Sequence, residues 1–154
     1  MIEDVTIRQA TLSDIDDVIA LTRAAYEGYI PLLARAPTPM QKDYGESIVA
    51  SDVWLLAVDG VPCAAIVLET QDKAMLVYSI VVHPDHQGKG LGQRLLAFAK
   101  DRAHAVGRNA MRLCTSDKMA RNLAIYAAFG YHETGREEFD VANSPTVVWM
   151  TKEL

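Results

Sequence analysis

The sequence predicts an α+β fold in which a mixed, mostly antiparallel central sheet is flanked by helices. Segments of strand length, either alternating or continuously apolar, lie between segments whose apolar residues recur at helical spacing. The turn Asp59-Gly60 joins two strand-like segments directly, as in a hairpin. Strands and helices follow one another in a mixed order, which favours the α+β class.

The first half of the chain is expected to contain four strands and two helices. Alternating or continuous apolar residues predict strands over 5–9, 53–58, 63–69 and 74–82. After the capping residues that begin at Thr11, apolar residues recur every three or four positions, which predicts a helix over 15–26. Three prolines make the following stretch irregular, and a short second helix is expected over 40–50.

The second half is expected to contain two helices and three strands. One helix presents an apolar face from Leu91 to Val106 and ends at Gly107. A short helix over 120–129 ends at Gly130. The expected strands cover 111–115, 131–141 and 146–152.

Composition indicates one ordinary globular domain. Of the 154 residues, 50% are hydrophobic and 23% are charged, and such a chain can bury a core. No apolar run approaches the roughly 20 residues that span a bilayer. The first residues lack the basic and apolar regions of a secretory signal. We therefore expect a single domain over 1–154, located in the cytoplasm and without a membrane partner.

The charge distribution argues against a nucleic-acid partner. The formal net charge is −5, and lysine and arginine are scattered along the chain. Nucleic-acid binding requires a concentrated basic face. An acidic surface instead tolerates a cationic substrate such as an amine.

No metal site is expected. Cys63 and Cys114 lie within strand-like runs and are interpreted as buried, reduced side chains. His83 and His86 are three residues apart on a proline-containing turn, and no third ligand lies nearby in the sequence.

A glycine-rich turn separates the strand over 74–82 from the helix that follows it. Its sequence is Gln87-Gly88-Lys89-Gly90-Leu91-Gly92. Glycines allow the backbone to approach a phosphate closely, and the first amides of the helix are free to donate to it. Lys89 and Arg94 add positive charge. The pattern indicates an anion-binding turn.

The spacing of the glycines excludes two common nucleotide motifs. The dinucleotide pattern Gly-x-Gly-x-x-Gly fails because Gln93 or Leu95 stands where its third glycine belongs. The Walker pattern fails because Gly88 is not followed, five positions later, by Gly-Lys. The pattern that fits is Gln-x-x-Gly-x-Gly.

Residues 80–96, which contain this pattern, resemble the coenzyme A motif of the GNAT N-acetyltransferase superfamily. Residues 122–131 are similar to the second motif of that superfamily, a helix that carries a tyrosine, here Tyr126, shortly before Phe-Gly-Tyr. The order of the expected elements also follows the family, so the resemblance covers essentially the whole chain.

The resemblance implies acetyl-CoA as the acyl donor, without a metal. The backbone of the splayed strand would pair with pantetheine, and the glycine turn would hold the pyrophosphate. The implied cofactor contacts are Ile80, Val81, Val82, Gln87, Gly88, Lys89, Gly90, Leu91, Gly92 and Gln93. A backbone N–H near Val82 would polarise the thioester carbonyl. Tyr126 would protonate the leaving thiolate; alternatively, its ring is a core aromatic.

Two assignments stay open at this stage. Many family members carry an asparagine seven residues before the tyrosine, where this chain has Met119. Asn122 lies one helical turn before Tyr126 and either contacts the cofactor or caps the helix. Glu69 is a candidate for the general base or a solvated strand end. Tyr78 and Ser79 should point to opposite faces of their strand.

The acceptor site is expected around the irregular segment that follows the first helix, although a satellite core is an alternative. Its candidate residues are Tyr26, Tyr29, Met40, Trp54 and Tyr78. The expected function is transfer of an acetyl group to a primary amine of a small molecule. The alternatives are a protein amino terminus or lysine as acceptor, and a coenzyme A-binding sensor without catalysis. The family also suggests a homodimer.

Overall fold

The computed structural model describes residues 4–28, 42–50, 52–138 and 145–154. One seven-stranded sheet with the order β1-β2-β3-β4-β5-β7-β6 forms the centre of the fold. Among the described strands only β4 and β5 pair in parallel, so the mixed, mostly antiparallel sheet is confirmed. The strands are β1 (Val5–Gln9), β2 (Val53–Val58), β3 (Val61–Thr70), β4 (Met75–Val82), β5 (Ala110–Ser116), β6 (His132–Glu137) and β7 (Val147–Glu153).

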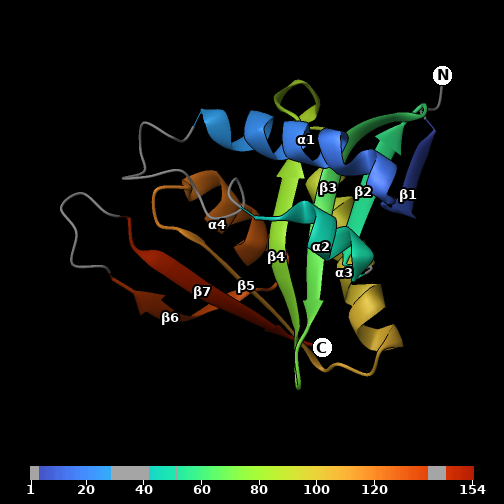
Figure 1. Cartoon of the computed structure of the whole chain (residues 1–154). Helices are drawn as coiled ribbons and strands as arrows, with labels where there is room; N and C mark the ends of the chain where they lie inside the picture. The colour runs from blue at the N-terminus through green and yellow to red at the C-terminus, as the bar shows by residue number, and fades with distance from the viewer. Residues whose placement is uncertain (1–3, 29–41, 51, 139–144) are drawn as a thin grey trace.

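Helices cover the two faces of this sheet in pairs. The front face in Figure 1 carries α1 (Ile15–Glu27) and α2 (Tyr44–Val49), which share an apolar cluster with one side of β2, β3 and β4. The opposite face carries α3 (Leu91–Ala105) and α4 (Ala120–Ala128), which pack on the larger cluster. None of the described helices is both long enough and apolar enough to cross a membrane.

The parallel strands β4 and β5 separate after a short paired stretch. Their pairing covers only Met75–Val77 on β4 and Met111–Leu113 on β5. Between β3 and β4 the register shifts at this level: Val67 pairs with Ser79, whereas Leu68 pairs with Val77. Tyr78 is therefore an extra, bulged residue, and a bulge bends its strand and increases the local twist. Beyond it the two strands diverge, as Figure 1 shows.

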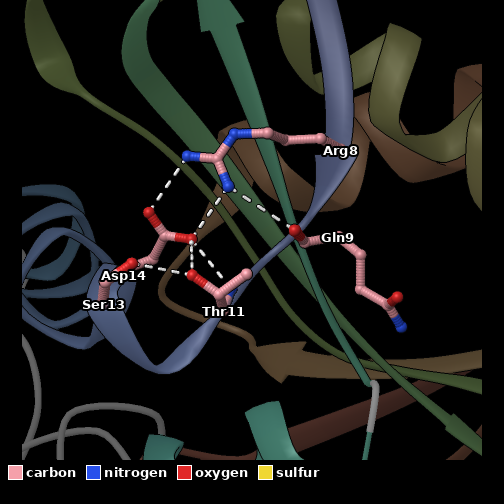
Figure 2. Close-up of polar contacts among 5 residues, drawn as sticks. All are labelled: Arg8, Gln9, Thr11, Ser13 and Asp14. Carbon is pink, nitrogen blue, oxygen red and sulfur yellow. Dashed lines mark hydrogen bonds and ion pairs between the residues drawn. The ribbon is translucent and has the colours of Figure 1, made fainter.

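A buried carboxylate organises the chain between β1 and α1. The carboxylate of Asp14 accepts hydrogen bonds from Nη1 and Nη2 of Arg8, at 2.8 and 3.0 Å. It also accepts one from the backbone N–H of Thr11 at 2.8 Å (Figure 2). These hydrogen bonds hold the pKa of Asp14 well below its usual range, and those from Arg8 contribute most. The contacts fix the position of α1, which supplies one wall of the cavity described below.

Replacement of Asp14 by asparagine should lower the free energy of unfolding by about 1–2 kcal/mol at pH 7, because a charge-assisted pair between a buried carboxylate and a half-exposed guanidinium is lost. A carboxylate whose pKa is depressed in the folded state stabilises the fold above its unfolded pKa. That stability is lost as the pH falls below about 4. Denaturant unfolding should therefore separate Asp14→Asn from wild type at pH 7 and bring them together in acid. Glu133→Gln, which removes an exposed pair with Arg136, is the control and should change little.

Candidate active site

The glycine turn has the backbone geometry that its sequence predicted. Gly88 and Gly90 adopt φ values of 83° and 79°, in the left-handed region that favours glycine. Gly90 is the N-cap of α3, so the next amides lie at the free amino end of that helix. Gly92 faces β4, where an added Cβ would lie 3.9 Å from Cγ2 of Val82. The end of β4, the glycine turn and the start of α3 thus form one continuous surface.

A cavity opens between this surface, the diverging end of β4, α4 and the end of α1. The structure brings together in its lining most of the residues predicted from the sequence: Tyr26, Ile80, Val81, Val82, Gln87, Gly88, Gly90, Leu91, Gly92, Gln93, Asn122 and Tyr126. Lys89 is absent from the lining, and its Nζ instead lies 3.4 Å from Nδ1 of His86. The cavity occupies the place where β4 and β5 have lost their pairing.

Tyr126 reaches this cavity from α4. The residue is 6% exposed, and its ring packs against Tyr131 with the ring centroids 6.1 Å apart. Within the described part of the chain, its hydroxyl makes no hydrogen bond. Burial raises the pKa of Tyr126, and the neighbouring Tyr26 raises it further. A protonated hydroxyl therefore lies at the cavity wall and is available to a ligand.

Tyr26 reaches the same cavity from α1, on the other face of the sheet. Burial is also the main cause that raises its pKa, followed by Tyr44, Cys114 and Tyr78. Two tyrosines from helices on opposite faces thus meet where the sheet is open.

Asn122 and Met119 both line the cavity, and Nδ2 of Asn122 lies 3.8 Å from Sδ of Met119. Their neighbour Arg121 also lines the cavity and was not predicted from the sequence. Its Nη1 donates to Oε1 of Gln87 at 3.3 Å, and Nε2 of Gln87 donates to the carbonyl oxygen of Val82 at 3.2 Å. A cation in the first turn of a helix is opposed by the helix dipole. This unfavourable position of Arg121 could have indicated from the sequence that the residue has a binding role. The other unpredicted lining residues are Ala25, His86, Leu96 and Ile125.

Glu69 does not line the cavity. Its carboxylate accepts Nζ of Lys42 at 3.2 Å, and the same ammonium lies 4.0 Å from the centroid of the Tyr78 ring. Burial raises the pKa of Tyr78 to about 12. Tyr78 is likewise outside the cavity lining, although it is close enough to Tyr26 to interact with it electrostatically.

The expectation that Tyr78 and Ser79 point to opposite faces is wrong. Tyr78 packs against the cluster that contains Tyr44 of α2, and Ser79 is hydrogen-bonded to the hydroxyl of Tyr44. Both side chains therefore lie on the α1–α2 face. The cause is the bulge at Tyr78, because an extra residue interrupts the alternation of a regular strand.

Trp54 is not part of this site. Its ring packs against Phe98 of α3, with centroids 4.9 Å apart, and the guanidinium of Arg102 lies 5.2 Å from its centroid. Its neighbours Val53 and Leu55 face α1 and α2, so alternation along β2 turns Trp54 to the opposite face. Tyr29 and Met40 lie outside the described residues.

The two cysteines differ in exposure. Cys63 is buried as expected, but Cys114 is exposed, which corrects the expectation for this residue. Met111 and Leu113 point into the core on the α3 side of β5, so the alternation of that strand places Cys114 on the other face. Although part of Cys114 is exposed to solvent, the surrounding protein limits the hydration of its thiol, and this desolvation raises the pKa of the thiol.

The sequence matches the model of one protein family. A family model described as "Acetyltransferase (GNAT) domain" matches residues 50–133, more than half of the chain. The matched segment runs from the start of β2 to the start of β6 and includes the glycine turn and α4. The chain belongs to the GNAT acetyltransferase family.

Individual relatives are more distant. The chain is 36% identical over 59 residues to an L-amino acid N-acyltransferase, MnaT, from Escherichia coli strain K12, a match that covers 38% of the chain and 34% of the relative. It is 27% identical over 139 residues to an amino-acid acetyltransferase from Azotobacter vinelandii, covering 90% of the chain and 30% of the relative. The chain thus spans about a third of the length of these curated relatives.

The fold is shared with solved acetyltransferase structures. The crystal structure of PaiA N-acetyltransferase from Thermoplasma acidophilum, in complex with coenzyme A, superposes with a TM-score of 0.80 at 17% sequence identity. The superposition covers 98% of this chain and 99% of that one. At this identity the similarity establishes the fold.

Proposed function

We propose that the protein is an N-acetyltransferase that moves the acetyl group of acetyl-CoA to a primary amine of a small molecule. The observation that carries the proposal is the gap between β4 and β5, with the glycine turn at its edge and Tyr126 in its wall. Family membership supplies the class of reaction.

The residues present fit coenzyme A. The left-handed glycines leave the turn open to a pyrophosphate, and the free amides that begin α3 can donate to it. Within the gap, the backbone of 80–82 lies along the cavity and lacks β5 as a partner, so it can pair with the amides of pantetheine. Lys89 is left out of this set because it does not line the cavity.

The chemistry assigned to the chain is one proton transfer and one polarisation. Bound acetyl-CoA would supply an activated thioester. An alkylamine has a pKa near 10.4 and must lose a proton before it can attack. The neutral amine, having lost its proton to solvent, would attack the thioester carbon, and the C–S bond would break as the C–N bond forms. The backbone N–H near Val82 would polarise the carbonyl and Tyr126 would protonate the departing sulfur. The second proton, released by the nitrogen, would pass to solvent, from which the tyrosinate regains its own. The raised pKa of Tyr126 suits this role because the hydroxyl is protonated before the reaction. Glu69 is not part of the proposed mechanism, since it pairs with Lys42 outside the cavity.

The choice of a small acceptor is supported by the relatives and by the site. Both curated relatives described above are named for amino acids. Tyr26 lines the gap from the α1 side, opposite α4.

An amine panel tests the proposed function. Purified protein, acetyl-CoA and each of a series of amino acids, diamines, aryl amines and peptides are incubated, and thiol release is measured after subtraction of hydrolysis. We expect thiol release together with an equal amount of N-acetylated product for at least one small amine. Peptides as the only acceptors would contradict the small-molecule assignment. Binding of acetyl-CoA without any amine turnover would contradict the enzyme.

A further inference from the structure

Arg112 lies on the face of the sheet that carries α1 and α2. In β5, Met111 and Leu113 point into the core under α3, so Arg112 and Cys114 point to the face that carries α1 and α2. Cys114 is close enough to Tyr26, Tyr78 and Tyr126 to interact electrostatically with each of them. Arg112 therefore lies on the same face as Cys114, two residues before it along β5.

The guanidinium of Arg112 is held in place by an aromatic ring. Its Cζ lies 4.7 Å from the ring centroid of Trp149 on β7. The indole is fixed in turn, because its Nε1 donates to Oε1 of Glu137 on β6 at 2.8 Å. A stacked guanidinium keeps its edge N–H groups free, and their fork matches the two oxygens of a carboxylate.

Arg112 also lacks an anionic partner within the described residues. Two carboxylates near this face have other partners, since Glu69 pairs with Lys42 and Glu137 accepts the indole N–H of Trp149. No ion pair of Arg112 occurs among residues 4–28, 42–50, 52–138 and 145–154. Arg112 is nevertheless only partly exposed. A partly desolvated cation with a fixed orientation is well suited to bind an anion.

We propose that Arg112 binds a carboxylate of the acceptor, so that the preferred acceptor is an amine that also carries a carboxylate group. The proposal rests on the function proposed above and narrows its substrate class. The amine would lie at the gap near Tyr26 and Tyr126, and the carboxylate would extend along β5 to the guanidinium stacked on Trp149. A compound that contains only an amine lacks this second contact.

The chain offers a matched control for the test. Arg102 stacks on Trp54 in the same manner, at 5.2 Å, but on the α3 face of the sheet. Arg112→Gln and Arg102→Gln each remove one guanidinium from one tryptophan. Only the first change should affect recognition of the acceptor. Arg112→Lys keeps the charge and loses the fork, so it should have an intermediate effect.

The experiment compares kcat/KM for amino acids and for the corresponding amines without the carboxylate. Wild type should prefer the carboxylated member of a pair by about 10- to 100-fold, the range expected of a charge-assisted hydrogen-bonded pair. Arg112→Gln should abolish this preference through a higher KM for the carboxylated member alone, and Arg102→Gln should preserve it. Thermal unfolding of each variant checks that it is folded.

The outcomes separate the two proposals. If wild type acetylates amines without preferring carboxylated ones, the role of Arg112 is wrong and the enzyme assignment stands. Equal losses on both members of a pair in folded Arg112→Gln and Arg112→Lys would mean that the residue is structural, which also overturns the proposal. If wild type acetylates nothing in either set, both proposals fail.

Discussion

Replacement of Tyr126 by phenylalanine is expected to lower kcat by about 100- to 10,000-fold, the range over which a general acid contributes to catalysis. The affinity for acetyl-CoA should hardly change. The hydroxyl has no hydrogen-bond partner among the described residues, so its removal orphans no group there. The ring itself, packed on Tyr131, is retained. Steady-state kinetics at saturating acetyl-CoA and calorimetric titration of the cofactor measure the two quantities.

Tyr131→Phe is the matched control for this prediction. Tyr131 is equally buried, at 4% exposure against 6% for Tyr126, and the two rings are in contact, but Tyr131 does not line the cavity. Loss of its hydroxyl should leave kcat nearly unchanged. If the two variants lose activity equally, or if Tyr126→Phe weakens cofactor binding as much as turnover, Tyr126 has a packing role.

Replacement of Gly90 by alanine is expected to weaken acetyl-CoA binding by at least about 10-fold. A Cβ at a φ of 79° costs roughly 1–2 kcal/mol in the left-handed region. The side chain itself has room, because the nearest atom, Oε1 of Gln93, is 4.0 Å away. The turn should therefore shift toward a less strained backbone and move its amides away from the pyrophosphate. Equilibrium titration with acetyl-CoA measures the loss.

Gly107→Ala separates backbone strain from binding. Gly107 lies just beyond the other end of α3, has a φ of 73°, and has nothing within 4 Å of an added Cβ. Its replacement by alanine should lower the free energy of unfolding by about 1–2 kcal/mol, the same strain as at Gly90, and should leave the affinity for acetyl-CoA unchanged. If Gly107→Ala weakens cofactor binding as much as Gly90→Ala does, the effect is general destabilisation and the glycine turn is not the phosphate site.

The sequence was sufficient to predict the order and most of the bounds of the elements. β1 and β2 have the predicted ends, because each shows a clear apolar pattern next to a turn or a helix cap. The main differences are α2, which covers 44–49 instead of 40–50, and β6, which covers 132–137 instead of 131–141. Parts of both predicted ranges lie outside the described residues. Most of the glycine-turn residues that line the cavity were also predicted, since the glycine pattern is local in sequence.

It was harder to predict which of the candidate acceptor-site residues lie at the cavity, because this depends on the face of the sheet to which each strand residue points. Periodicity tells which residues share a face and leaves open which helix covers it. Trp54 was a candidate for the acceptor site, whereas its ring packs against Phe98 of α3. The bulge at Tyr78 breaks the alternation on which the assignment of Ser79 relied. Arg112 and Trp149 are 37 positions apart in the numbering and meet only because β5 pairs with β7. Such contacts arise from tertiary structure.

The central claim is that acetyl-CoA binds in the gap between β4 and β5. Amide hydrogen exchange with and without saturating acetyl-CoA tests it directly. We predict slower exchange for the amides of 80–82 and 88–93, and no change in β1 at the edge of the sheet. Saturable binding of acetyl-CoA that protects other segments and leaves both of these unchanged would contradict the claim.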